Sequence, residues 1–167
     1  MGNELDLIKE FFDYNTFVRR KYFEKIFKEL PEEERYKDRG ASFPSLVDIF
    51  VHVIDGYRYW LYYTINDKVN EYYSLRGKIK SPDEVEREML KVEKLIKEFF
   101  DGLNEEDLNK VVTYSYKNKK YQRRIKTILL HLIEEELQHR GELNALLWQI
   151  DIDPPVIGYD EWMEQKS

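Results

Sequence analysis

The chain has 167 residues, of which 42% are hydrophobic, so it can bury one sizeable core and we expect a single domain over residues 1–167. It contains no cysteine, which excludes disulfides and thiolate ligands, so any metal site must use nitrogen and oxygen atoms. The net charge of −6 argues against nucleic acid as a partner. Because no apolar run is long enough to cross a membrane, we expect a cytoplasmic protein without membrane partners.

Apolar residues recur with the helical period in two stretches of the N-terminal half. The first predicted helix covers roughly residues 3–30. The second begins near residues 42–45, where Ser42 could cap it, and ends near residue 66. Residues 67–80 show no sustained period and predict a long crossover, which would let the second and third helices run parallel.

The C-terminal half predicts two further helices with a short extended segment between them. Ser81 is expected to cap the third helix, which ends at Gly102. Residues 111–116 alternate as in a strand. The fourth helix is expected to run from about Tyr121 to Ile150. Four amphipathic helices of this length predict an all-α fold, a four-helix bundle.

The fourth predicted helix carries His131, Glu135 and His139 at intervals of four residues. Side chains at that spacing share one helix face and can close on a single ion. Continuing the apolar stripe of this helix places Glu135 and His139 at buried positions, whereas Glu134 and Glu136 are expected to point elsewhere. Because a buried carboxylate needs a cation, a proton or hydrogen-bond donors beside it, a divalent ion would suit this helix.

The second predicted helix carries the remaining histidine, His52, and one turn later Gly56. A glycine inside a helix costs about 1 kcal/mol relative to alanine. Either something approaches the backbone there, or two helices pack closely. Simpler interpretations of the polar residues also remain open: His131 could be a surface residue, and Glu135 could pair with Arg140 or with a buried tyrosine.

A basic cluster precedes and begins the fourth predicted helix. It consists of Lys117, Lys119, Lys120, Arg123, Arg124 and Lys126. We expect a solvated turn and helix start, without substantial binding of nucleic acid at physiological salt. Cations at a helix N-terminus nevertheless oppose the helix dipole. An anionic ligand or partner carboxylates could offset that repulsion.

Several motifs, taken in their order and spacing, resemble the DinB-like superfamily of metal-binding four-helix-bundle proteins. They are Tyr14-Asn15, Ser42-Phe43-Pro44-Ser45, His52, Trp60, the stretch HLIEEELQHRGE from His131 to Glu142, and Pro154-Pro155. The resemblance covers nearly the whole chain. It implies an up-down-down-up bundle with a long crossover between the second and third helices. It also implies a divalent metal held by one histidine of the second helix and an H-x-x-x-H pair of the fourth.

In this chain His52 and His139 match two of the implied ligand positions, and Glu135 occupies the third, where the family usually has histidine. Two histidines with one carboxylate can bind zinc or iron and leave open positions, and nickel and manganese are further candidates. Alternatively, the glutamate weakens the site to the point of loss. His131 lies about 12 Å along the helix axis from His139, too far to share an ion. We expect His131 to be a proton carrier one turn from the metal, or an ordinary boundary residue.

The resemblance implies a divalent-metal-dependent transferase or hydrolase that acts on a small electrophilic molecule, with a low-molecular-weight thiol as candidate co-substrate. A metal of this kind makes bound water or thiol more acidic and more reactive. The alternative is a non-catalytic, stress-related bundle protein that holds a metal or a small ligand. A third hypothesis is that these polar residues have only a structural role in the bundle. Aromatic residues beyond the core stripe, such as Tyr59, Tyr62 and Tyr63, predict a homodimer.

Overall fold

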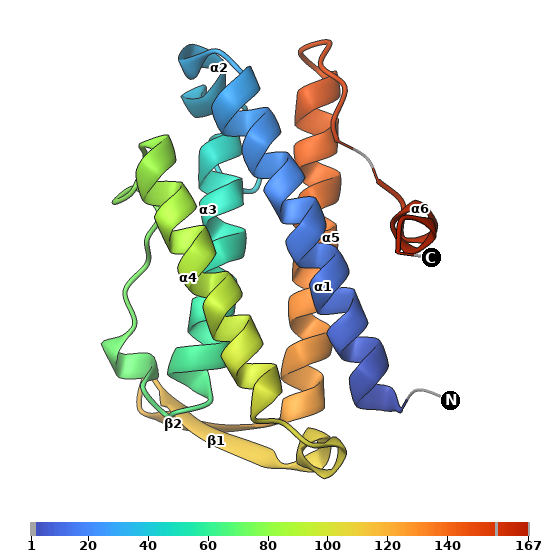
Figure 1. The fold of residues 1–167 in the computed structure, drawn as a ribbon. Coiled ribbons are helices and arrows are strands. Elements are labelled where there is room, and N and C mark those ends of the chain that lie inside the picture. The colour runs from blue at the N-terminus through green and yellow to red at the C-terminus, as the bar shows by residue number, and fades with distance from the viewer. Residues whose placement is uncertain (1–2, 156, 167) are drawn as a thin grey trace.

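Four long helices surround the core of the computed structural model, which describes residues 3–155 and 157–166 (Figure 1). They are α1 (Glu4–Phe23), α3 (Leu46–Tyr57), α4 (Pro82–Asp101) and α5 (Ile125–Trp148). Shorter helical segments are α2 (Glu32–Tyr36), α6 (Tyr159–Glu164), two π-helical turns at Glu24–Glu29 and Arg58–Thr64, and two 3-10 turns at Val69–Glu71 and Glu105–Asn109. Buried apolar residues from the long helices form one continuous cluster. None of the helices in the described ranges has the length and apolar character needed to cross a membrane.

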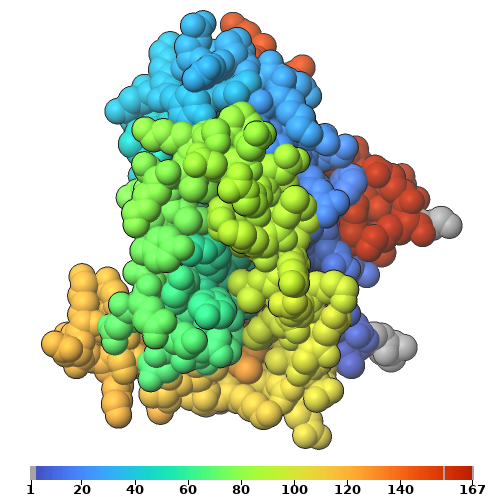
Figure 2. Space-filling model, turned by 60° about the vertical axis from the view of Figure 1, so that its left-hand side comes forward, coloured from blue at the N-terminus to red at the C-terminus, as the bar shows by residue number. Residues whose placement is uncertain are grey.

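The expected extended segment at residues 111–116 is confirmed as a strand, but it belongs to a small antiparallel hairpin that the all-α fold did not include. Strand β1 (Val111–Tyr116) pairs with β2 (Lys119–Arg124). Lys117 and Asn118 form the turn with φ angles of 49° and 61°, as the two-residue hairpin turns that match strand twist require. The predicted helix start at Tyr121 is therefore wrong, because residues 119–124 pair with β1. Figure 2 shows the hairpin, in orange, projecting beyond the helices at one end of the molecule.

The helix starts follow local capping chemistry. Ser81 caps α4 as predicted: its hydroxyl accepts from the Glu84 amide, and the Glu84 carboxylate accepts from the Ser81 amide. Ser42, however, does not cap α3. That position belongs to Ser45, whose hydroxyl accepts from the Asp48 amide at 3.1 Å. Ser42 lies in the loop before α3 and contacts α5 instead.

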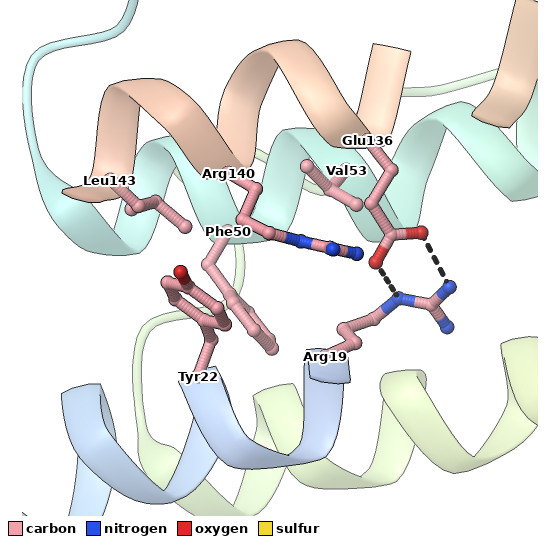
Figure 3. Close-up of a pocket in the computed structure, with 7 residues that line it drawn as sticks. All are labelled: Arg19, Tyr22, Phe50, Val53, Glu136, Arg140 and Leu143. Carbon is pink, nitrogen blue, oxygen red and sulfur yellow. Dashed lines mark hydrogen bonds and ion pairs between the residues drawn. The ribbon is translucent and has the colours of Figure 1, made fainter. Parts of the chain in front are cut away.

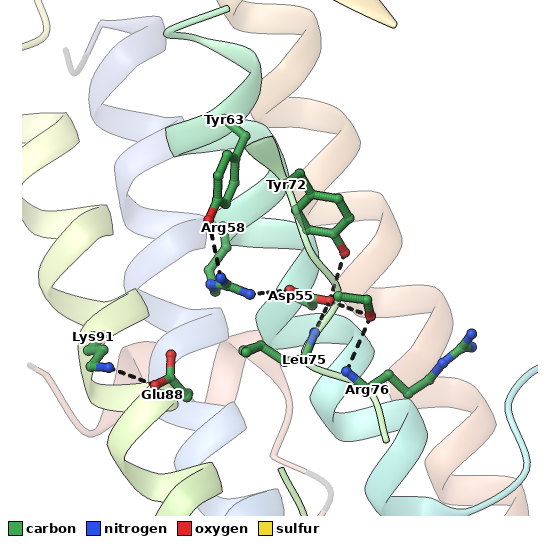
Figure 4. A network of polar contacts seen from close by, with 9 residues as sticks. Asp55, Arg58, Tyr63, Tyr72, Leu75, Arg76, Glu88 and Lys91 are labelled. Atoms are coloured by element: carbon green, nitrogen blue, oxygen red, sulfur yellow. Dashed lines mark hydrogen bonds and ion pairs between the residues drawn. The ribbon is translucent and has the colours of Figure 1, made fainter. Parts of the chain in front are cut away.

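The long crossover that follows the Arg58–Thr64 turn is anchored on the buried carboxylate of Asp55 in α3 (Figure 4). This carboxylate accepts hydrogen bonds of 2.6 to 2.9 Å from the Arg58 guanidinium, the Tyr72 and Ser74 hydroxyls and the Leu75 amide. Burial, together with the bond to Asp55, raises the pKa of the Tyr72 hydroxyl. Because the crossover is fixed up to Leu75, the following residue, Arg76, has a defined place beside α3.

Candidate metal centre

Three side chains from two helices converge at one edge of the bundle. His52 comes from α3, and Glu135 and His139 come from α5. One potential ligand atom of each lies within 4.8 Å of the others. The Nε2 atoms of His52 and His139 lie 3.5 and 3.9 Å from the same Glu135 oxygen. Both distances exceed the usual N–H···O length of about 2.7–3.2 Å, but they resemble the roughly 3.4 Å between ligand atoms around a tetrahedral ion with bonds of about 2.1 Å.

The imidazole of His139 is oriented by a carboxylate on its far side. The Nδ1 atom of His139 lies 3.1 Å from Glu142, whose oxygens accept from the amide and the hydroxyl of Ser42 at 2.6 Å each. Partial burial opposes ionisation of Glu142, but the bonds from Ser42 and His139 hold its pKa below the ordinary value. A carboxylate on one ring nitrogen fixes a histidine so that the other nitrogen can face an ion. Sequence reasoning missed this role, although the three-residue spacing of His139 and Glu142 places both on one helix face.

An aromatic side chain from the loop before α3 packs against both histidines. The Phe43 ring lies 4.2 Å from the His52 ring and 5.7 Å from the His139 ring, measured between centroids. The guanidinium of Arg76, from the crossover, lies 4.5 Å from the Phe43 centroid. Burial and the neighbouring His139 lower the pKa of His52, against an opposing effect of Glu135. His52 is therefore held in the neutral form that binds metal ions.

The three residues differ in how far they reach the surface. The side chain of His139 is 7% exposed, whereas those of His52 and Glu135 are 32% and 35% exposed. The expectation that Glu135 lies on the buried stripe and Glu136 points elsewhere is wrong: Glu136 is buried at 4% exposure. The stripe passes from Leu132 to Glu136 by a four-residue step, which leaves Glu135 at its edge. Glu135 and His52 therefore give the centre an open side.

Glu136 has partners of its own within the core. Its carboxylate accepts from Arg19 Nε and from an Arg19 terminal nitrogen at 3.1 and 2.8 Å (Figure 3), and it also accepts from the Tyr57 hydroxyl. The Arg19 guanidinium lies 4.4 Å from the Tyr57 centroid. The adjacent cavity is about 20 Å³, room for a water molecule but not for a substrate. We refer to Arg19, Tyr57 and Glu136 as the buried ion-pair cluster, and its packing assigns it a structural role.

Three other residues singled out from the sequence do not belong to the converging group. The His131 side chain is 37% exposed; its ring is 5.2 Å from that of Trp60, and its Nδ1 is 3.4 Å from Glu134. His131 is thus outside the converging group. Arg140, a suggested partner of Glu135, instead donates to Asn15 at 2.8 Å. Around Gly56 the structure leaves open space: no atom of a packed neighbour lies within 4 Å of a Cβ placed there, so close helix packing does not explain this glycine.

Two comparisons find known proteins similar to this chain. A family model, that of the DinB family, matches residues 1–166. A solved structure, described as a DinB-like protein from Bacillus cereus ATCC 10987, is similar with a TM-score of 0.63 and 15% identity over 88% of this chain and 93% of that chain. At this identity the likeness shows the fold alone. A comparison with curated proteins finds no match.

Proposed function

The chain belongs to the DinB family, and from that premise we propose that it is a divalent-metal-dependent transferase or hydrolase acting on a small electrophilic molecule. The proposed metal ligands are His52, Glu135 and His139. One observation carries the proposal: three ligand atoms of suitable type lie within 4.8 Å of one another. No lysine or arginine in the described part of the chain pairs with Glu135.

The donor set fits an ion of the zinc, nickel, iron or manganese type, since two imidazoles and a carboxylate suit all four. A divalent ion held there would supply Lewis acidity, which makes a water or thiol a better nucleophile near neutral pH. Glu142 fixes the His139 ring, and the charge of Glu135 offsets part of the ion's charge. The exposed sides of His52 and Glu135 leave a path for a substrate. We assign His131, one turn from Glu135, the role of proton carrier.

The proposal extends to architecture and assembly. In Figure 1 the chain runs in one direction along α1 and α5 and in the other along α3 and α4, which supports an up-down-down-up four-helix bundle. For a homodimer, support comes from Leu130 and Leu137, which lie seven residues apart on α5 and are 45% and 43% exposed. Tyr62 is exposed as well, whereas Tyr63 is buried. Light scattering that finds only monomer at micromolar concentrations would contradict the dimer.

Metal binding can be tested on protein purified without a polyhistidine tag. We expect elemental analysis to find a divalent metal, and thermal unfolding to shift upward on addition of Zn²⁺, Ni²⁺, Mn²⁺ or Fe²⁺. His131→Ala should retain the shift, and His139→Ala should lose it. Protein without metal, and without any shift, would instead indicate that these polar residues have only a structural role.

Turnover requires a separate assay on the metal-loaded protein. We expect consumption of a small electrophile, such as an epoxide, in the presence of water or a low-molecular-weight thiol. Substitution of His52 by alanine should abolish it. Retained metal with every coordination position filled by protein atoms, and no consumption, would favour the non-catalytic binding protein.

A further inference from the structure

A hollow lies beside the candidate metal centre, between the hairpin and the start of α5. It measures about 320 Å³ and is lined by Trp60, Arg123, Thr127, Ile128 and His131. This volume falls within the range of small-molecule sites, about 300–1,000 Å³. His131 lies one helical turn from Glu135, so the near wall of the hollow is about 6 Å along the helix axis from the centre.

Between the candidate metal centre and the hollow, the α3 segment contacts α5 at two places, and the space between these two contacts is open. On α3 and its π-helical extension, His52, Gly56 and Trp60 follow one another at intervals of four residues. His52 lies 3.5 Å from Glu135, and the Trp60 ring lies 5.2 Å from the His131 ring. Gly56 lies between these two contacts, and the space over it is open. The absent side chain therefore leaves room between the hollow and the centre.

The π-helical turn Arg58–Thr64 places Trp60 at the wall of this hollow. Such turns insert an extra residue into a helix and are frequent at functional sites. The indole of Trp60 and the side chain of Ile128 give the hollow an apolar wall. This wall suits a flat or aromatic body.

The opposite end of the hollow is positively charged. Arg123 donates to the Gln122 carbonyl at 2.8 Å, and across residues 3–155 and 157–166 it forms no ion pair. Lys126 in the same basic cluster pairs with Glu4 at 2.5 Å. A neighbouring carboxylate therefore offsets the positive charge of Lys126 but not that of Arg123. Helix α5 also begins here without a side-chain cap or an acidic residue in its first turn. The positive end of its dipole adds to the charge of Arg123.

We infer that this hollow binds a small organic anion with a flat apolar body, its anionic group on Arg123 and Thr127 and its other end directed over Gly56 toward the metal centre. The role of that second end rests on the proposed function, whereas binding in the hollow does not. Thr127 and Glu135 are separated by about 12 Å along the helix axis. A ligand of about that length would reach both.

The experiment uses 2-naphthoate as the probe and 2-naphthamide as its uncharged counterpart. Each is titrated calorimetrically into protein stripped of metal with a chelator, and into protein loaded with zinc. We expect saturable 1:1 binding of naphthoate to both forms, and binding of the amide about tenfold weaker or worse, because charge-assisted hydrogen bonds are the stronger ones. Arg123→Ala should weaken naphthoate about tenfold and leave the amide unchanged.

Lys120→Ala is the matched control, since it removes one positive charge from the same strand but from a residue that does not line the hollow. We expect it to change naphthoate affinity less than about twofold, as a screened surface charge should. Absence of naphthoate binding, equal binding of the amide, or an Arg123→Ala variant that binds as wild type would overturn the inference. Zinc content is measured on the same samples. Arg123-dependent binding of naphthoate to a protein that takes up no zinc would refute the metal proposal and leave the hollow assigned.

Discussion

Glu135 and Glu136 are consecutive residues of α5, yet their surroundings differ in kind. Glu136 is buried and receives hydrogen bonds from Arg19 and Tyr57, so the chain itself neutralises its charge. Glu135 is partly exposed and faces the Nε2 atoms of two histidines at 3.5 and 3.9 Å. No lysine or arginine of the described residues forms an ion pair with it. Burial therefore does not distinguish the carboxylate that we propose as a metal ligand; the chemistry of its partners does.

The largest effect on stability is expected from a substitution that breaks the buried ion-pair cluster. Glu136→Gln keeps the side-chain volume but leaves the Arg19 charge buried without a counter-ion. We expect the free energy of unfolding to fall by about 3–5 kcal/mol, measured by urea denaturation. The matched variant Glu135→Gln should change the stability of the metal-free protein by less than about 0.5 kcal/mol.

A paired substitution separates charge loss from packing. Replacing Arg19 by Met together with Glu136 by Leu removes both charges and should recover much of the lost stability, because a buried ion pair is often no better than well-packed apolar residues. Equal losses in Glu136→Gln and Glu135→Gln would show that the two carboxylates do not differ as described.

The converse test concerns metal affinity. Glu135→Gln removes the proposed anionic ligand, and we expect zinc affinity to fall about 100-fold. Loss of a residue that only hydrogen-bonds to a metal ligand already costs about 10–100-fold. A competing chelating dye measures it. Glu135→His should bind at least as well as wild type, because it creates the three-histidine set implied by the family resemblance. A zinc affinity unaffected by Glu135→Gln would remove this residue from the site.

A smaller loss is expected where the orientation of His139 is disturbed. Glu142→Gln weakens the acceptor for His139 Nδ1 and for Ser42, and we expect zinc affinity to fall about tenfold or somewhat more. Glu134→Gln, on the same helix, is the control and should leave affinity unchanged. If both variants bind zinc equally, Glu142 does not position the histidine.

The buried cluster also predicts a dependence of stability on alkaline pH. Burial and the charge of Glu136 raise the pKa of Tyr57 above its ordinary value of 10.0. In the unfolded chain Tyr57 loses its proton near that pH, while in the folded state it keeps it. The contribution of Tyr57 to the free energy of unfolding is therefore complete below about pH 10 and is lost as the pH rises further. Urea unfolding between about pH 8 and 11 should show a steeper decline for wild type than for Tyr57→Phe, and identical slopes would contradict this.

The smallest expected effect lies at Gly56. Alanine there adds a methyl group into open space and improves helix propensity, so unfolding should cost up to about 1 kcal/mol more. Zinc affinity should stay within about twofold, since the added group lies outside the contacts between the three proposed metal ligands. A destabilised Gly56→Ala variant would reveal a close contact at this position.

The sequence was sufficient to predict a helix start where the residues that cap the helix are close together in the chain. Ser81 predicted the start of α4, and the structure shows why a local signal suffices: its capping partner, Glu84, lies only three residues away. The start of α5 was not predictable in this way. Its preceding residues, 119–124, are mostly charged and show no apolar alternation, and they become a strand only by pairing with β1.

At the candidate metal centre, too, features set by spacing along one helix could be predicted, and features set by contacts between distant segments could not. Four-residue spacing on α5, together with the family motifs, predicted the three residues that converge. Spacing could not decide whether Glu135 or Glu136 faces the core, because steps of three and four residues both continue a helical stripe. The role of Glu142 depends on Ser42, which lies 100 residues away in sequence. Such a contact is set by tertiary packing.

Zinc stoichiometry tests the central claim most directly. Untagged protein would be loaded with zinc, dialysed against metal-free buffer and submitted to elemental analysis, with circular dichroism to verify the fold of each variant. We predict one zinc ion per chain for wild type and for His131→Ala, and loss of the ion from a variant in which His52 and His139 are both replaced by alanine. One ion retained by that double variant, or none bound by wild type, would contradict the metal centre at His52, Glu135 and His139.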